Sequence, residues 1–333
     1  MQEVADRAHV SIATVSHVIN KTRFVSDDVA HRVVEAMDSL GYHPNRIARS
    51  LRTRRTDTIG LVIPDAANPY FADIAAAVEH AARQIGLSTV FCNSAGSADI
   101  ERHYLKVLSE HRVDGIILVG SGTGDPSPVT ALNMTIPVVI VDRDEPGFTG
   151  DSIHTDNEYG GWIATRKLTE LGHRSIMCFA GPDAVMPSNE RVDGYRRALE
   201  VAGLSNYISI AVGEFDAPSG YRLTMQALTA NEPPTAIFAC NDLMAVGALS
   251  AAHELNVSVP DELSVVGFDD IDLAQFTVPP LTTVAQPRAE LGAAAVNVLA
   301  TRIRGEAGAV TSSVPPCRIV NRHSTAPPPI ATT

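Results

Sequence analysis

From Thr58 onward the chain alternates short apolar runs with helical patterns, and no other feature constrains its fold as strongly. The runs are rich in β-branched residues and apolar on both faces, which is typical of buried strands in a parallel sheet. They lie at residues 58–64, 87–93, 114–120, 137–142, 174–180, 208–215, 235–241 and 263–269. The helical patterns between them lie at about 70–86, 98–112, 157–171, 188–202, 217–230 and 242–255. Two successive blocks of this kind predict two doubly wound α/β lobes.

The bulk composition fits a globular chain of two or three domains. Of its 333 residues, 45% are apolar, which is enough for sizeable cores. No run approaches the roughly 20 apolar residues that span a bilayer. The chain also does not begin with a charged segment followed by an apolar one, as a secretory signal peptide does. We therefore expect a cytoplasmic protein without a membrane partner. Because Cys92, Cys178, Cys240 and Cys317 stand singly, we expect buried free thiols rather than disulfides or a metal site.

The net charge of −12 is unevenly distributed along the chain. Residues 1–56 hold 9 Lys and Arg against 6 Asp and Glu, whereas the remaining residues hold 17 against 32. A basic head on an acidic body suits DNA binding by the head alone, because the phosphates of a duplex repel the body.

The first twenty residues predict two short amphipathic helices joined by a turn at His9. Val4 and Ala8 recur at helical spacing in the first, and Ser11 can cap the second, which buries Val15. Such a pair forms a helix-turn-helix, whose second helix can enter the DNA major groove. The alternative is that both are surface helices that cap a larger fold.

A third helix is expected over residues 25–40, with Ser26 as its N-cap and Gly41 at its end. The three helices make a compact head, which we bound at residues 1–43. The next segment, 44–55, is rich in arginine and holds no acid. It is too short to be a stable helix alone in water, so the residues by themselves indicate a solvated basic linker.

The stretch VSIATVSHVINKTRFV, residues 10–25, closely resembles the reading head of the lactose/galactose repressor (LacI/GalR) family of bacterial regulators. Its second part is most similar to the purine and ribose repressor branches, and the likeness continues to about residue 325. The resemblance implies that His17 and Arg23 contact bases and that other side chains hold phosphates or thymine methyl groups. The DNA-binding residues that it implies are Ser11, Ile12, Ala13, Thr14, Ser16, His17, Asn20, Arg23, Leu51 and Arg52.

The resemblance also implies how the remaining parts are arranged. Residues 44–57 match the family's hinge helix, in which the leucine at position 51 wedges between bases in the minor groove. The last helix, about 287–304, is expected to return to the first lobe. A bilobed ligand-binding and dimerisation domain of the periplasmic-binding-protein type then covers residues 58–325. We place lobe one at about 58–156 and 287–325, lobe two at about 157–286, and a frayed tail at 326–333.

Polar and aromatic residues follow the strand ends, where open parallel sheets bind ligands. The candidate ligand-binding residues are Asn68, Tyr70, Phe71, Asp142, Arg143, Arg191, Phe215, Asn241, Asp269 and Gln286. Each has a purely structural alternative: Asn68 can cap a helix, and Asp142 can pair locally with Arg143. Together, rings, carboxylates, amides and guanidinium groups suit a sugar. The set resembles the ribose-binding pattern of periplasmic receptors, which favours ribose or a related monosaccharide; a purine is the alternative.

These features predict a homodimeric transcription repressor that binds a pseudo-palindromic double-stranded operator under the control of a small ligand. The ligand can act as inducer or as corepressor. Residues 120–124 form GxGxG rather than GxGxxG, which disfavours a nucleotide-dependent enzyme. A transport receptor is disfavoured because the chain carries a reading head. We expect no catalytic residue, cofactor or metal.

Overall fold

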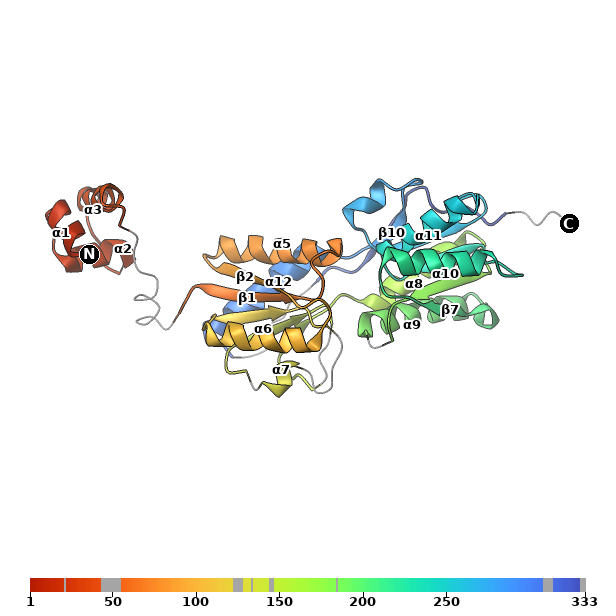
Figure 1. The fold of residues 1–333 in the computed structure, drawn as a ribbon, viewed down its shortest axis with the longest axis horizontal. Coiled ribbons are helices and arrows are strands. Elements are labelled where there is room, and N and C mark those ends of the chain that lie inside the picture. Colours follow the sequence, from red (N-terminus) through yellow and green to blue (C-terminus); the bar gives the residue numbers. More distant parts are fainter. Residues whose placement is uncertain are drawn as a thin grey trace. The chain divides into compact units, whose positions relative to one another are not determined.

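The computed structural model of the chain describes residues 1–20, 22–42, 55–121, 128–132, 134–143, 147–183, 185–307 and 314–329. It divides into two compact units, residues 1–56 and 57–333. The first unit is a small helical head, and the second consists of two α/β lobes (Figure 1). This is the fold class that the sequence predicts.

The head is a bundle of three short helices, α1 (Gln2–Ala8), α2 (Ile12–Asn20) and α3 (Asp27–Ser39). Their apolar stripes meet in one core, formed by Val4, Ala5, Ala8, Val15, Val33 and Ala36. His9 ends α1 in the left-handed conformation, with φ of 55° and ψ of 48°. Histidine tolerates this conformation better than a β-branched residue does. The turn of the predicted helix-turn-helix therefore forms without a glycine.

The two predicted caps of the head behave differently. The Ser11 hydroxyl accepts a hydrogen bond from the backbone N–H of Thr14 at 3.1 Å, so it caps α2 as expected. Ser26 precedes α3 but makes no side-chain capping hydrogen bond. Asp27 and Asp28 in the first turn still stabilise the helix, because their negative charges interact favourably with the positive N-terminal end of the helix dipole. The third helix is thus slightly shorter than predicted and begins without a side-chain cap.

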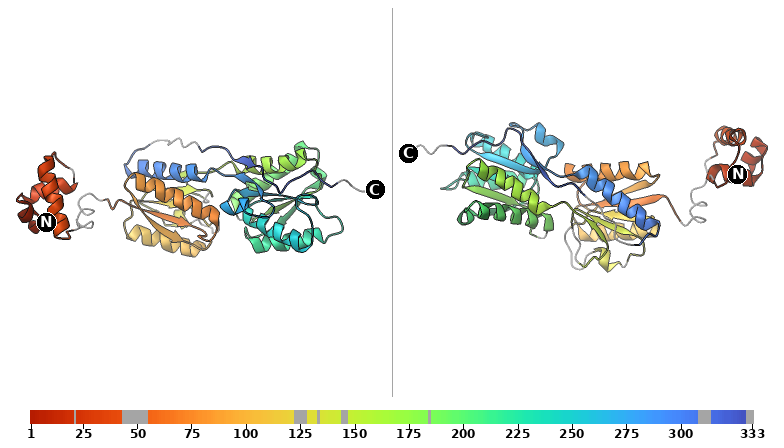
Figure 2. Two further views of the ribbon diagram at one scale, coloured as in Figure 1. Left: turned by 90° about the horizontal axis from the view of Figure 1, so that it is seen from above. Right: turned by 180° about the vertical axis from the view of Figure 1, so that it is seen from behind.

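The first lobe is built on a five-stranded parallel sheet with the order β2-β1-β3-β4-β5. Its strands are β1 (Thr58–Ile63), β2 (Ser88–Asn93), β3 (Gly115–Leu118), β4 (Val138–Val141) and β5 (Asp151–Ile153). The helices against it are α5 (Pro69–Gln84), α6 (Ala98–Glu110), α7 (Pro128–Ala131) and α12 (Arg288–Ile303). Figure 2 shows α12, from far along the chain, lying beside α5 on one face of the sheet.

The second lobe is built on a six-stranded sheet with the order β11-β10-β9-β8-β6-β7, parallel except for β11. Its strands are β6 (Ile176–Ala180), β7 (Ser209–Val212), β8 (Ala236–Ala239), β9 (Ser264–Asp269), β10 (Thr282–Ala285) and β11 (Arg318–Val320). Its helices are α8 (Asn157–Glu170), α9 (Met186–Val201), α10 (Ala217–Leu228) and α11 (Asp242–Glu254), with 3₁₀ turns η1 (Ser205–Tyr207) and η2 (Asp272–Gln275).

In both lobes the strand order reverses beside the first strand, between β1 and β3 and between β6 and β8. Loops on the two sides of such a reversal diverge, which leaves a crevice at the carboxyl ends of the strands. The two sheets therefore each offer one wall of a ligand site.

The expected assignment of residues 287–325 to lobe one is only partly right. Helix α12 packs on α5 and on β3 and β4 of the first lobe, as predicted. Strand β11, however, pairs antiparallel with β10 and so belongs to the second lobe. A three-residue antiparallel edge strand leaves almost no periodic pattern in a sequence, which is why it was not foreseen.

The tail predicted to fray from residue 326 is anchored at its start. The backbone carbonyl of Ala326 accepts a hydrogen bond from the Ser264 hydroxyl at 3.0 Å and lies 2.9 Å from Nε2 of His173. Its N–H donates to the same serine oxygen at 3.0 Å. Since both partners are buried in the second lobe, the chain stays attached there beyond residue 325.

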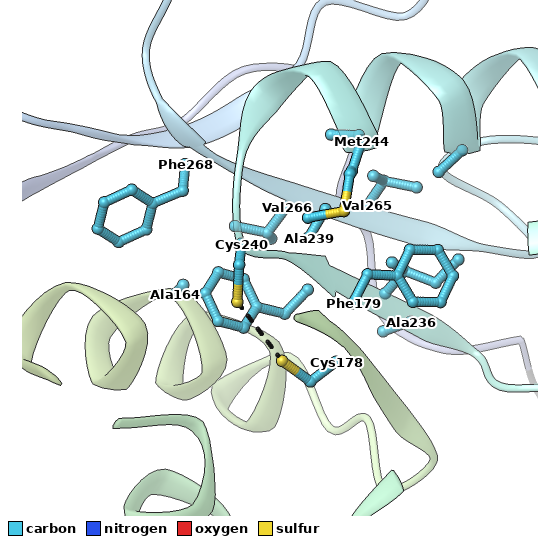
Figure 3. Close-up of a cluster of buried hydrophobic side chains, with 14 of the residues drawn as sticks. Ala164, Cys178, Phe179, Ala236, Ala239, Cys240, Met244, Val265, Val266 and Phe268 are labelled. Atoms are coloured by element: carbon cyan, nitrogen blue, oxygen red, sulfur yellow. Dashed lines mark hydrogen bonds between the residues drawn. The ribbon is translucent and has the colours of Figure 1, made fainter. Parts of the chain in front are cut away.

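Each lobe has its own buried core, and the second-lobe core is shown in Figure 3. There, Met244 of α11 belongs to the core, whereas the ring of Phe268 lies on the other face of the sheet, against α8 at Gly160. The Sγ atoms of Cys178 and Cys240 lie 3.7 Å apart in this core. All four cysteines are free and buried, which confirms the prediction. No helix within the described ranges is long and apolar enough to cross a membrane.

Candidate functional site

A cavity of about 630 Å³ lies between the two lobes at the carboxyl ends of their strands. Nine of the ten predicted ligand residues line it: Asn68, Tyr70, Phe71, Asp142, Arg143, Arg191, Phe215, Asn241 and Asp269. Its wall combines aromatic rings with two buried carboxylates, Asp142 and Asp269, and two buried guanidinium groups, Arg143 and Arg191. The residues predicted from scattered positions are thus brought together in one place.

Gln286, the tenth residue, lies behind the cavity wall rather than in it. Its Oε1 accepts a hydrogen bond from the Thr155 hydroxyl at 2.7 Å and lies 3.2 Å from the Tyr70 hydroxyl. Its Nε2 donates to Oδ1 of Asp269 at 2.8 Å. Gln286 therefore links side chains of both lobes, and its predicted direct contact with the ligand is not supported by its position.

Tyr70 and Asp142 form the lobe-one part of the polar wall. The Tyr70 hydroxyl donates to Oδ1 of Asp142 at 2.5 Å. Burial, followed by the nearby carboxylates of Asp142 and Asp269, raises the pKa of Tyr70 well above its usual value. The phenol therefore stays protonated and occupies one carboxylate oxygen of Asp142.

Arg143 follows Asp142 and is held mainly by backbone. Its Nη1 donates to the carbonyl of Ser121 at 2.8 Å, and its Nε lies 3.7 Å from Oδ2 of Asp142. The guanidinium carbon lies 5.3 Å from the ring centre of Phe71. Burial lowers the pKa of Arg143 from its ordinary value, but an arginine remains charged at neutral pH. Its Nε is fully buried and has no hydrogen-bond partner among the described residues.

Arg191 and Asp269 form the second charged pair, in lobe two. Nη1 of Arg191 lies 3.8 Å from Oδ1 of Asp269, and its guanidinium carbon lies 3.9 Å from the ring centre of Phe268. Nε and Nη1 donate to Asn157 and to the carbonyl of Cys240, at 2.9 and 2.6 Å. These bonds fix the planar group before any ligand arrives. Burial raises the pKa of Asp269 to about 6, against the opposing effect of Arg191.

The close crossing of α8 and α9 positions Arg191. A Cβ atom at Gly161 would lie 2.1 Å from the carbonyl oxygen of Arg191, and one at Gly194 would lie 2.0 Å from the carbonyl oxygen of Glu158. Only glycine allows these backbones to approach so closely, so the two helices dock and aim Arg191 at the cavity.

The ring of Phe215 is placed by its neighbours. A Cβ atom at Gly181 would lie 2.2 Å from this ring, so a glycine is required there. Asn241 donates to the carbonyl of Phe215 at 2.8 Å. Three wall residues, Asp142, Phe215 and Asp269, have positive φ values of 70°, 59° and 110°. Non-glycine residues rarely adopt such angles, and they concentrate at functional sites.

The two asparagines of the cavity wall also cap helices, which is the structural alternative to ligand binding. Oδ1 of Asn68 accepts from the N–H of Tyr70 at 3.0 Å and caps α5. Oδ1 of Asn241 accepts from the N–H of Met244 at 2.9 Å and caps α11. Both side chains also line the cavity, so capping and a ligand contact through the amide are compatible.

Other wall residues had no signal in the sequence. Ser121, Val185, Glu214 and Asp216 line the cavity from loops, where no periodic pattern marks an orientation. Thr155 reaches the site indirectly, through Gln286 and through Asn157, which accepts a hydrogen bond from Arg191. A strand end followed by a hydroxyl or acid is the only cue that could have suggested them.

The head presents the candidate DNA-reading face on α2. Ile12 and Ala13 are exposed, and Thr14, Ser16 and His17 are half-buried. Nδ1 of His17 lies 2.8 Å from the Thr22 hydroxyl, which fixes the imidazole ring. The exposed residues after the helix include Arg23 and Phe24, and Phe24, which sequence analysis did not single out, is 94% exposed.

Three predicted DNA contacts cannot be placed. Residues 43–54, which include Leu51 and Arg52 of the expected hinge helix, lie outside the described ranges, as does the side chain of Asn20. Most of the GxGxG stretch, residues 122–124, also lies outside them. Within the described ranges, no three His, Cys, Asp or Glu side chains gather as a metal site would require.

Comparisons with known proteins agree with this architecture. The family model described as bacterial regulatory proteins, lacI family, matches residues 1–45, and the model of a periplasmic binding protein-like domain matches residues 165–325. The HTH-type transcriptional repressor PurR of Photobacterium profundum is 38% identical over 306 residues, which are 91% of this chain and 92% of the relative. The ribose operon repressor of Escherichia coli is 40% identical over 307 residues, with the same two coverages of 91% and 92%.

A solved structure matches both units of the chain. The lac repressor dimer bound to operator and the anti-inducer ONPF has a TM-score of 0.86 and 30% identity, with coverage of 97% of this chain and 98% of that one. Since head, lobes and relatives agree, this protein belongs to the lacI family of bacterial regulatory proteins: it is a DNA-binding transcriptional repressor with a periplasmic-binding-protein-like ligand domain, and not an enzyme.

Proposed function

We propose that this repressor binds ribose or a related neutral monosaccharide between its lobes and changes its operator affinity in response. The observation that carries the proposal is the pairing of charges in the cavity wall. Asp142 with Arg143, and Asp269 with Arg191, place two acids and two guanidinium groups around one space. The charges of these four buried groups balance, and the less buried acids Asp65, Glu214 and Asp216 of the wall disfavour an anion. The site therefore suits a neutral ligand with many hydroxyl groups, which carboxylates and guanidinium groups can bind at two points each.

The rings in the wall support the same ligand class. Phe71 and Phe215 offer flat apolar faces from opposite lobes. The CH faces of a sugar ring pack on such surfaces, while its hydroxyl edge meets the charged groups. The ribose operon repressor among the relatives is consistent with this choice of effector.

A purine is the second candidate, since PurR is an equally similar relative. Tyr70 and Phe71 stand edge to face, with ring centres 5.2 Å apart and planes at 66°. A flat base can stack on only one of two rings that lie at such an angle. A base also lacks the adjacent hydroxyl groups that a carboxylate or guanidinium group can bind at two points, so we favour the sugar.

For the head, we propose that α2 reads the major groove of a pseudo-palindromic operator, with a second copy of the chain on the other half-site. His17 and Arg23 are the proposed base readers, and Ser11, Thr14, Ser16 and Asn20 the proposed phosphate contacts. Thymine methyl contacts fit the exposed Ile12 and Ala13. Leu51 and Arg52 are proposed to act in the minor groove. A chain that regulates transcription in a bacterium works in the cytoplasm.

The homodimer is supported by the dimeric lac repressor structure and by apolar side chains on the second lobe. Phe276 and Val278 are 74% and 92% exposed. Large apolar groups this exposed favour a subunit contact. Sedimentation of a Phe276→Ser, Val278→Ser variant should show more monomer than the wild type does.

The deciding experiment is a thermal-shift panel of pentoses, hexoses, nucleosides and purine bases, with and without operator DNA. We expect D-ribose or a close relative to raise the melting temperature of the wild type. The Asp142→Ala variant should lose this shift and still bind operator in the absence of ligand. A shift produced by purines alone would replace the sugar with the second candidate. A panel in which no compound acts would overturn the proposed ligand class.

A further inference from the structure

Helix α5 of the first lobe is linked twice to residues 286–288, where the chain returns from β10 of the second lobe to the start of α12 in the first lobe. Tyr70 and Asp73 lie three residues apart on α5, so both face the same side of the helix. The Tyr70 hydroxyl lies 3.2 Å from Oε1 of Gln286, and Oδ2 of Asp73 lies 3.4 Å from Nη1 of Arg288. Two neighbouring side chains of α5 thus meet two neighbouring side chains of one connection between the lobes.

Both links converge on Asp269 of the second lobe. Gln286 donates to its carboxylate at 2.8 Å, and Arg288 donates to its backbone carbonyl at 2.9 Å. Arg288 also donates to the carbonyl of Asp270 at 2.8 Å. Asp269 and Asp270 have φ values of 110° and 57°, which non-glycine residues rarely adopt. Arg288 therefore holds the strained backbone that places the Asp269 carboxylate in the cavity.

Arg288 and Asp73 themselves lie outside the ligand cavity. They line a separate groove of about 530 Å³ at the junction of the lobes. The side chain of Arg288 is 17% exposed and that of Asp73 is 43% exposed. A change in either residue can therefore alter the link between the lobes without removing a group that lines the ligand site.

We propose that Arg288 is a positioning residue that couples the ligand cavity to the angle between the lobes, with Asp73 as its partner on the first lobe. This inference rests on the proposed ligand-controlled function. When a ligand engages the Asp269 carboxylate, the backbone held by Arg288 shifts, and Arg288 transmits the shift to α5 through Asp73. A coupling of this kind needs a physical link whose geometry differs between the ligand-free and the ligand-bound arrangement of the lobes. The contacts of Arg288 can provide such a link, because they join the two lobes directly behind Asp269.

A simple structural brace would use the same contacts, so the test must separate coupling from stability. The variant is Asp73→Ala, which removes the α5 carboxylate that holds the Arg288 side chain and leaves the two bonds of Arg288 to the second-lobe backbone in place. The matched control is Glu79→Ala, which removes a carboxylate from the same helix that pairs only within it, with Arg83 at 3.2 Å. Asp73→Glu restores the carboxylate and serves as the rescue.

The first measurement needs no ligand. Spin labels on Glu110→Cys and Glu200→Cys, both exposed in the parent chain and on different lobes, report the distribution of lobe-to-lobe distances. The native cysteines are buried, which favours labelling at the two introduced positions. We expect Asp73→Ala to shift or broaden the distribution, and Asp73→Glu and Glu79→Ala to leave it like that of the parent. An unchanged distribution in Asp73→Ala overturns the proposal.

The second measurement is the ratio of operator affinities with and without saturating D-ribose, or whichever compound of the panel shifts the parent protein. Asp73→Ala should reduce this ratio by about two- to tenfold while the melting temperature stays near that of Glu79→Ala. If Asp73→Ala keeps the parent's ratio of operator affinities and changes only the melting temperature, the contact is purely structural and the proposed coupling is overturned. If no compound acts on the parent protein, the ligand proposal fails and the distance measurement alone decides the lobe link.

Discussion

The Tyr70 hydroxyl donates a hydrogen bond to Asp142 at 2.5 Å and thereby occupies an oxygen of a carboxylate that lines the ligand cavity. Both side chains are almost fully buried, with 3% of each residue exposed. A buried carboxylate that loses a hydrogen bond keeps its desolvation penalty without compensation. The tyrosine hydroxyl therefore offsets part of the cost of burying the Asp142 carboxyl group in this wall.

Replacing Tyr70 with Phe should lower the free energy of unfolding by about 1–2 kcal/mol, because it keeps the ring and removes only the hydroxyl. Urea denaturation at pH 7 measures the change. Tyr159→Phe is the matched control, since its ring stacks on Trp162 at the surface and is 37% exposed. Equal stability of the two variants would contradict a supporting role for the Tyr70 hydroxyl.

The raised pKa of Asp269 predicts a specific pH dependence of stability. In the folded protein this pKa is about 6, whereas an unfolded aspartate titrates near pH 4. Between these two values the folded state binds more protons than the unfolded state, so the contribution of Asp269 is fully present below about pH 4 and is lost as the pH rises through 6. The loss is on the order of 2–3 kcal/mol.

An Asp269→Asn variant lacks this titration, so its stability relative to the wild type should increase from pH 4 to pH 6.5. Denaturant titrations at several pH values give the two curves. Burial raises the pKa of Asp242, and repulsion from Asp269 adds to this rise. The variant removes that repulsion, which lowers the pKa of Asp242 and adds to the gain of the variant in the same direction. Asp193→Asn, which alters a largely exposed carboxylate, should follow the wild-type curve. Parallel curves for wild type and Asp269→Asn would refute the assignment.

The contact of Gly161 with the backbone of Arg191 predicts a severe effect of a small substitution. Gly161→Ala forces α8 and α9 apart, because the new methyl group would lie 2.1 Å from a carbonyl oxygen. We expect a loss of about 2–3 kcal/mol in stability and a weaker ligand-induced thermal shift, since Arg191 moves with α9. Glu170→Ala, at the exposed end of α8, is the control. A variant as stable as this control would show that the two helices can separate at little cost.

Much of this architecture could be predicted because its signals are local. All of the predicted apolar runs form strands. Most are buried and apolar on both faces, as parallel strands in a sheet interior must be, whereas β2 and β7 are partly exposed edge strands. The last helix returns to lobe one as expected, beside α5. Strands β5 and β11 are too short to show a period, and β11 depends on pairing with distant β10. Such pairings depend on the tertiary structure, which a local sequence pattern does not encode.

The candidate ligand site likewise contains residues that could be predicted from the sequence and residues that could not. Asp142 and Asp269 follow strands directly, and the sheet topology alone brings them to one edge. Gln286 also follows a strand, yet its side chain turns to Tyr70, Thr155 and Asp269 behind the wall. The importance of Arg288 could not be predicted, because its partners are backbone carbonyls and a single surface acid. Side-chain rotamers, and hydrogen bonds from side chains to backbone carbonyls, depend on tertiary packing, which a local sequence pattern does not specify.

The hydrogen-bonded ring of His17 bears on its proposed role as a base reader. Because Thr22 fixes this ring at Nδ1, the side chain is ordered before DNA arrives, and we expect it to read one base position without a large entropic penalty. His17→Ala should relax base preference at that position by about tenfold, and Thr22→Val should do so less strongly, as the ring then rotates freely. Selection of operator sequences from a random pool measures both. Ser16→Ala, a proposed phosphate contact, should weaken binding to all sequences alike and leave the preference intact. If His17→Ala selects the same sequences as the wild type, the ring does not read a base.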